Sequence, residues 1–350
     1  MAGFGCGPPR PSVERLLMAA LSDQLLVLTI LAYVAAMVGY AAEHAFGTSD
    51  AAAPAIVRES AMAGTAAVGH ATRSDDPVPA GQRRPAGARG RGDRWAGRLA
   101  VCATLVGVLS QVGCVVTRGV AAGRVPWGNM YEFILVVSLT GVVAWLVLLV
   151  RRPRVRPLGL YVTFTAVILL GLAGMRVYTA AGPLVPALNS YWLKIHVSAA
   201  AVASGIFLLG FVVAALQLLR SRHDRRLPAV ALTTPTLVTT LGRRLPDAAV
   251  LERLSFRLHA FGFPIWTFAV LAGAVWAEAA WGRYWGWDPK EVWAFISWVV
   301  YAAYLHARAT PSIKRTTTAW LAVLGWATMM INLFAVNLVV AGLHSYAGTE

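Results

Sequence analysis

The sequence predicts an all-α membrane protein: a polytopic helical bundle of about eight transmembrane helices with a tryptophan-rich extracytoplasmic loop. Of the 350 residues, 57% are hydrophobic and only 13% are charged, and the mean hydropathy is +0.60. A soluble domain of this length does not tolerate that balance. In addition, several apolar runs approach the ~20 residues that a helix needs to cross a bilayer. These runs lie at 22–42, 97–117, 131–150, 157–175, 192–219, 258–280, 290–307 and 318–343.

Positive charges crowd alternate connections between these runs, and the positive-inside rule places such connections in the cytoplasm. The crowded residues are Arg151, Arg152, Arg154 and Arg156, then Arg220, Arg222, Arg225, Arg226, Arg243 and Arg244, then Arg308, Lys314 and Arg315. Connections 118–129, 176–191 and 281–289, with both termini, then face outward from the plasma membrane. This distribution accounts for the net charge of +15, so no nucleic-acid partner is expected.

Three segments follow from this reading. Residues 1–42 form an N-terminal segment with the first transmembrane helix, whose apolar run is longer than that of a cleavable signal peptide. Residues 43–95 are rich in Ala, Gly, Pro, Arg and Asp, which predicts a flexible basic cytoplasmic linker. Residues 96–350 form the main membrane domain. The three cysteines of the chain, Cys6, Cys102 and Cys114, make no CxxC or CxxCH motif, which argues against a dithiol oxidoreductase and against a c-type cytochrome.

Histidines at helix ends are the first candidate ligands. His196 opens the fifth apolar segment and His344 closes the last one, both on the outer side. Two neutral imidazoles at one depth on separate helices suit the axial positions of a haem iron. The alternative is that both bond interfacial water or backbone. His44 and His259 are expected to be interfacial or satisfied in the core.

His306 lies on the inner side, about 24 Å along its helix from Lys290 at 1.5 Å per residue. If it ligates a metal, the second ligand is expected from another polypeptide. The alternative is a helix-end histidine that faces lipid headgroups.

The stretch "WGRYWGWDPKEVW" at 281–293 places many aromatic rings at the outer boundary. An aromatic belt alone would scatter one or two tryptophans per helix end and would not enclose a polar Asp-Pro-Lys-Glu sequence. Trp281, Trp285 and Trp287 can instead provide a platform for a porphyrin. Asp288 precedes Pro289 at the start of a helix, so a simple N-cap remains an alternative role for it.

Cations on the outer side run against the positive-inside bias and suggest anionic partners. Haem propionates would explain Arg283, Lys290, Arg118 and Arg124, together with Arg176 and Lys194. Ordinary ion pairing with Glu132, Glu278, Asp288 or Glu291 explains any single one of them equally well.

The tryptophan-rich stretch resembles the WWD signature of haem-handling proteins, and its surroundings resemble the CcsA/ResC family (CcsB in actinobacteria) of System II cytochrome c biogenesis. The resemblance covers roughly 95–350. It rests on "GRVPWGNMYEF" at 123–133, "PALNSYWLKIHV" at 186–197, "FGFPIWTFAVLAGAVWAEAAWG" at 261–282 with Trp276, "YLHAR" at 304–308 and "NLVVAGLHSYA" at 337–347.

The resemblance implies a subunit of a cytochrome c haem lyase, or holocytochrome c synthetase. Such a subunit binds haem b at the outer face and presents its vinyl groups to the CxxCH thiols of an apocytochrome c. By the same resemblance His196 and His344 are external haem ligands, His306 binds haem on its way across, and a ResB-like membrane partner supplies the missing ligand. No catalytic residue is assigned. A haem exporter that forms no bond and a b-type electron-transfer subunit remain alternatives.

Overall fold

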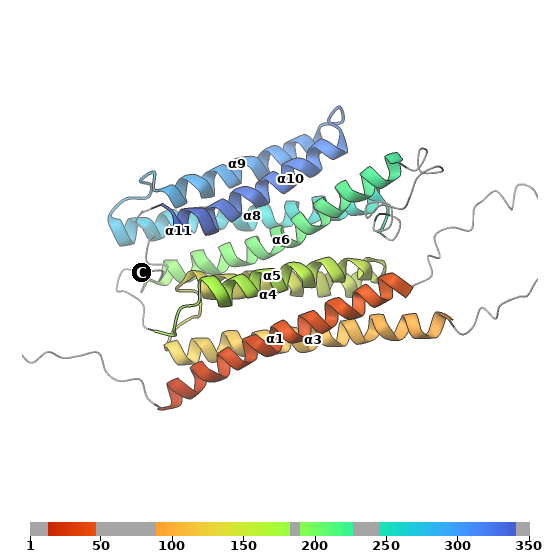
Figure 1. The fold of residues 1–350 in the computed structure, drawn as a ribbon. Helices are drawn as coiled ribbons and strands as arrows, with labels where there is room; N and C mark the ends of the chain where they lie inside the picture. The colour runs from red at the N-terminus through yellow and green to blue at the C-terminus, as the bar shows by residue number, and fades with distance from the viewer. Residues whose placement is uncertain (1–12, 47–88, 183–189, 227–241, 243–244, 341–350) are drawn as a thin grey trace, which may run out of the picture.

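The computed structural model is a bundle of long helices that run back and forth along one axis (Figure 1). It describes residues 13–46, 89–182, 190–226, 242 and 245–340. Within these ranges there is no β-strand, and eight helices have 16 or more residues. They are α1 (Val13–Phe46), α3 (Arg89–Ala122), α4 (Met130–Arg151), α5 (Gly159–Arg176), α6 (Tyr191–Arg226), α8 (Ala248–Trp281), α9 (Pro289–Ala309) and α10 (Arg315–Met330).

Short helical turns complete the described chain. A 3₁₀ turn, Pro153–Leu158, leads into α5. After α10 the chain makes a π-helical turn, Ile331–Ala335, and then the short helix α11 (Val336–Leu338). The predicted all-α membrane bundle is therefore confirmed.

Seven of the described helices are long and apolar enough to cross a membrane, and α9 is not among them. Its mean hydropathy is lowered by polar residues in its first and last turns and by tryptophans and tyrosines in its interior. It nevertheless packs lengthwise against α8 and α10, as Figure 1 shows. The sequence analysis counted this segment as one of about eight spans.

Helix α6 is the centre of the bundle. Of its most apolar window 78% is buried inside the protein, against 33–44% for the other six spans. It packs against α4, α8 and α10. Small residues allow the close approach to α4: a Cβ on Gly205 would lie 2.9 Å from the backbone nitrogen of Gly141. Such small-residue contacts are typical of helix packing in membranes.

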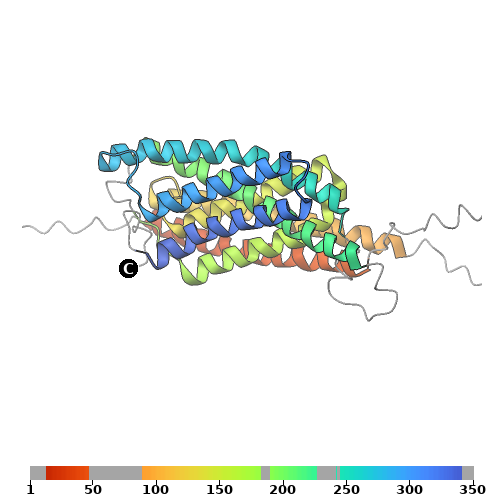
Figure 2. The same ribbon diagram turned by 90° about the horizontal axis from the view of Figure 1, so that it is seen from above.

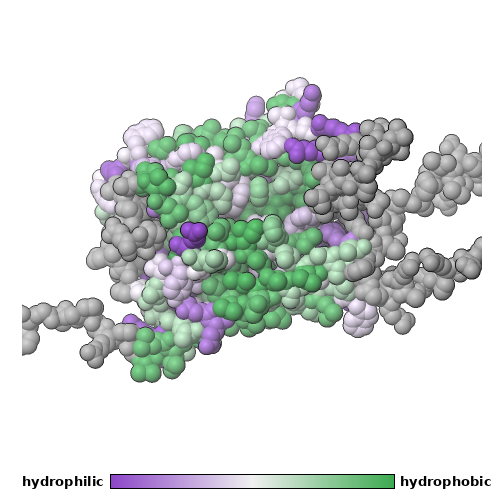
Figure 3. Space-filling model, viewed as in Figure 1, coloured by the Kyte–Doolittle hydropathy of each residue, from purple (hydrophilic) through white to green (hydrophobic). Residues whose placement is uncertain are grey.

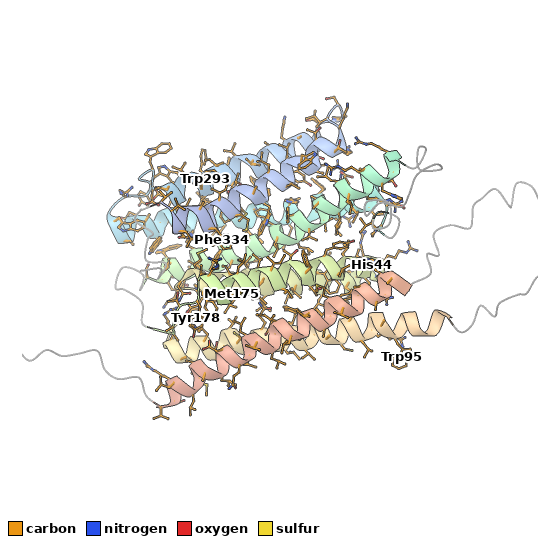
Figure 4. All side chains as sticks on the ribbon, viewed as in Figure 1. His44, Trp95, Met175, Tyr178, Trp293 and Phe334 are labelled. Carbon is orange, nitrogen blue, oxygen red and sulfur yellow. The ribbon has the colours of Figure 1, made fainter. Side chains whose placement is uncertain are left out.

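The two ends of the bundle differ in chemistry. The tryptophan end comprises the 123–129 and 282–288 connections and residues 177–182 after α5. The arginine end comprises the connections that follow α4 and α9 and the C-terminal end of α6. Figure 2 shows the helices running between these ends, and Figure 4 places Tyr178 and Trp293 toward the first, His44 and Trp95 toward the second. The face in Figure 3 is mainly apolar between them, as a bilayer-exposed surface requires.

Ion pairs tie the helices together at the arginine end. Glu43 of α1 pairs with Arg156, and Glu252 of α8 pairs with Arg308 of α9. Helix α1 extends to Phe46 and α3 starts at Arg89, so both margins of the expected 43–95 linker are helical. Residues 47–88 lie outside the described residues.

Candidate functional site

A cavity of about 240 Å³ opens in the tryptophan end between α4, α6, α8, α9 and the end of α10. Its walls are mostly apolar and aromatic, as in small-molecule sites. The large aromatic side chains that line it are Trp127, Phe133, Trp266, Trp276, Tyr284 and Trp285. Helix α6 contributes His196 near the loops and Ser204 two turns deeper, a separation of about 12 Å at 1.5 Å per residue.

His196 is held in one orientation by α8. Its Nδ1 lies 2.7 Å from the carbonyl oxygen of Ala269. Because a carbonyl only accepts, Nδ1 carries the proton, and in the neutral imidazole Nε2 then carries the lone pair, the arrangement seen in metal-ligating histidines. The ring stacks on Trp276 with an interplanar angle of 10°. A Cβ on Gly273 would come within 2.7 Å of the imidazole, so only glycine leaves room for it.

The tryptophans of the loop divide into two groups. Trp281 packs edge-on against Trp276, with ring centroids 4.8 Å apart, and so supports the wall behind His196. Trp285 lines the cavity, whereas its edge-on neighbour Trp287 is 73% exposed. Trp287 has a φ of 60°, a backbone conformation that costs free energy in a bulky residue.

Asp288 caps α9. Its side chain accepts a hydrogen bond from the Lys290 N–H at 3.1 Å, and the Glu291 side chain returns to accept one from the Asp288 N–H. Glu291 also accepts the Gly286 N–H at 2.8 Å. This capping box ties the loop to the helix that follows it. Capping is the alternative role that the sequence analysis gave for Asp288, beside a direct role in binding.

The four expected propionate partners lie in different surroundings. Lys290 lines the cavity, and the Arg283 guanidinium lies over Gly286 in the loop. Arg118 and Arg124 both bind Glu132 and are absent from the cavity lining. Both guanidinium groups therefore contact the Glu132 carboxylate, which is the ordinary ion pairing that the sequence analysis gave as the alternative to haem propionates.

The other candidate iron ligands are separated from the cavity or lie beyond description. His344 lies outside the described residues, so its distance from His196 stays untested. His306 is exposed on the surface of α9 near the arginine end. His259, by contrast, is fully buried and bonds the Ser255 carbonyl at 2.8 Å. Within the described ranges, no group of three or more His, Cys, Asp or Glu residues could hold a metal ion.

Two amides in the wall escaped the sequence analysis. Asn332 and Asn337 line the cavity, and the buried Oδ1 atom of each has no hydrogen-bond partner among the described residues. Asn332 lies in the π-helical turn Ile331–Ala335, a feature that is frequent at functional sites. No local sequence signal marks such a turn. The sequence analysis named Glu132 only as one of four possible ion-pair partners, although Asn129 and Glu132 have capping-box spacing.

Comparison with known proteins identifies relatives over most of the chain. A family model described as cytochrome C assembly protein matches residues 127–344. The cytochrome c biogenesis protein CcsA of Gloeobacter violaceus is 34% identical over 299 residues, covering 71% of this chain and 86% of the relative. That of Guillardia theta is 35% identical over 241 residues, covering 66% and 79%.

A solved structure shares the fold. The cytochrome c heme lyase CcmF aligns with a TM-score of 0.54 over 95% of this chain, at 15% sequence identity. The alignment covers 49% of that protein, so this chain spans about half of its length. At this identity the likeness concerns the fold alone.

Fold and site together define a class of protein: a multi-pass helical membrane protein with a histidine-bearing, indole-walled cavity at one end of its bundle. The family match covers more than half of the chain. The chain belongs to the cytochrome c assembly protein family, in the CcsA/ResC branch that its motifs indicate.

Proposed function

We propose that this protein is the haem-handling membrane subunit of a System II cytochrome c haem lyase. It binds haem b in the cavity at the tryptophan end and presents the vinyl groups to the CxxCH thiols of an apocytochrome c. His196 is one axial ligand, His344 is the other, and the indoles of the wall cover the macrocycle. The relatives are cytochrome c biogenesis proteins by name, and this supports the proposal.

The observation that carries the proposal is the setting of His196. Its Nδ1–H donates to the Ala269 carbonyl, its ring stacks on Trp276, and it lines the same cavity as Trp285. An imidazole fixed by a backbone carbonyl is a better and more directed ligand. A porphyrin supplies the remaining equatorial nitrogens, so one or two histidines suffice to hold its iron.

Thioether formation needs little acid or base assistance from the protein. In thioether formation each cysteine S–H adds across one vinyl C=C bond, so that sulfur bonds one carbon and the proton reaches the other, with no net oxidation or reduction. Holding the thiols and the vinyl groups together in a fixed geometry accounts for the main catalytic term. No side chain of the cavity is required as a dedicated acid or base.

Orientation follows from the positive-inside rule. The arginine end faces the cytoplasm and the tryptophan end faces outward across the plasma membrane. Labelling with a membrane-impermeant thiol reagent tests this assignment: a cysteine at Tyr284, which is 62% exposed, should react in intact cells, and one at Arg225 should not. The reverse result would overturn the orientation.

A ResB-like membrane protein is the expected partner. His306 is exposed on α9, where a helix of another chain can reach it and supply a second iron ligand. This surface lies toward the arginine end, far from His196, which suits a site that haem occupies before it reaches the outer cavity.

Co-expression tests the function directly. This chain, a ResB-like partner and an apocytochrome c should together yield covalently bound haem, and His196→Ala should abolish it while the protein still inserts. Non-covalent haem in the wild type with no thioether product would instead indicate a carrier. Normal covalent attachment in the His196→Ala and His344→Ala double variant would refute the site assignment.

A further inference from the structure

A buried charge cluster lies beside the cavity and does not contact it directly. Arg118 of α3 and Glu132 of α4 are both completely buried, and Arg124 is 12% exposed. Charges are rarely buried so fully unless they are paired. Burying three charged side chains costs desolvation free energy. This cost points to a role for the cluster beyond simple ion pairing.

The Glu132 carboxylate accepts hydrogen bonds from several donors that precede α4 in the sequence. It accepts the Arg118 Nε at 3.2 Å and the two Arg124 terminal nitrogens at 2.7 and 3.1 Å. Its Oε2 also accepts the backbone N–H of Gly128 at 2.8 Å. Its own N–H donates to the Asn129 side chain at 2.9 Å. One carboxylate thus fixes both the side chains before the 125–130 turn and the backbone of the turn itself.

The fixed turn is a wall of the cavity. Trp127, Gly128, Asn129 and Met130 all line it, as does Trp285 of the 282–288 connection. The same arginines also bind the next connection, since Arg124 donates to the Gly182 carbonyl at 3.0 Å and Arg118 donates to that of Thr179. The Arg118 guanidinium further lies over the rings of Tyr131 and Tyr178, at 4.9 and 5.7 Å.

We infer that Glu132, clamped by Arg118 and Arg124, positions the 127–130 wall against the bound porphyrin, so that Trp127 joins Trp285 in enclosing it. This inference rests on the proposed function. It makes Glu132 a positioning residue and assigns the two arginines to the wall, not to the propionates. Removing hydrogen bonds that orient the groups around a metal site lowers metal affinity by about 10- to 100-fold. A positioning role of Glu132 predicts a loss of haem affinity of that order.

Haemin titration of the purified full-length protein tests the inference. Glu132→Gln should lower the affinity for haemin about tenfold and shift the absorption maximum of the bound haem. The milder Arg124→Gln should act in the same direction, and it keeps the Arg118–Glu132 pair in case Glu132→Gln fails to insert. The matched control is Glu43→Gln, which breaks an ion pair with Arg156 at the arginine end and should leave the affinity within about twofold.

A double-mutant cycle with Trp127→Ala separates positioning from general destabilisation. If Glu132 acts through the wall, Trp127→Ala alone should lower affinity by a similar factor, and adding Glu132→Gln should cost little more. Independent, multiplying effects would overturn the inference, as would an equal loss in Glu43→Gln. A wild-type protein that binds no haemin would refute the proposed function itself, whereas haemin binding that is unchanged by Glu132→Gln and by Arg124→Gln would refute only the positioning role.

Discussion

The Nδ1 atom of His196 lies 2.7 Å from the carbonyl oxygen of Ala269, 73 residues further along the chain. This contact joins α6 to α8 and sets both the tautomer and the direction of the ring. Because the acceptor is backbone, a substitution at Ala269 leaves the acceptor atom itself in place. The orientation of His196 instead depends on how closely α8 approaches, and Gly273 controls that approach.

Gly273→Ala should displace the imidazole of His196. The new Cβ would lie 2.7 Å from the ring, closer than real contacts allow, so the ring must tilt or the helices must separate. We expect the affinity for haemin to fall at least about tenfold, as for other changes that disturb the orientation of a metal ligand. Spectroscopic titration of the purified protein measures the loss.

The matched control for this change is Gly171→Ala. Gly171 also lies within a helix, in α5, but a Cβ there meets nothing within 4 Å. It should leave haemin binding unchanged, and it should keep or slightly raise helix stability because alanine is the better helix former. If Gly273→Ala and Gly171→Ala had the same haemin affinity, the close approach of Gly273 to His196 would not matter for binding.

The sequence predicted the helices and the ends of the bundle well because those features are local. Apolar run length and arginine placement mark each segment without reference to any other. The supports of the site are not local: Ala269 and Gly273 act on His196 only once α6 and α8 pair. Arg118 and Arg124 illustrate the same limit, since the choice between a propionate and Glu132 depended on how α3 and α4 pack.

The two central loop tryptophans should differ in their effect on haem binding. Trp285 lines the cavity, whereas Trp287 is 73% exposed. Trp285→Ala should therefore lower haemin affinity about tenfold by removing a large apolar contact, and Trp287→Ala should change it less than about twofold. Equal losses measured by titration would place Trp287 on the porphyrin as well. Trp287→Phe serves as a control for its exposed aromatic surface.

Asp288 allows capping and ligand binding to be separated. If it serves only as the N-cap of α9, Asp288→Asn and Asp288→Ser should retain haemin binding, because both residues cap helices well. Asp288→Ala should lose the cap, at a cost of about 1 kcal/mol in stability. Thermal unfolding and haemin titration of the three variants distinguish the roles. Weakened binding in Asp288→Asn without lower stability would show that the negative charge itself is needed.

His306 should matter only in the presence of the partner. Its side chain is exposed, so His306→Ala should change the free energy of unfolding by less than about 0.5 kcal/mol and should leave haemin binding at the His196 cavity intact in the isolated protein. After co-expression with a ResB-like protein, the haem content of the purified complex should fall at least about tenfold. Val150→Ala is the control, since Val150 is 83% exposed near the same end on α4. Its haem content should match the wild type, because Val150 cannot ligate iron. Full haem content in the His306→Ala complex would remove this histidine from the transfer route.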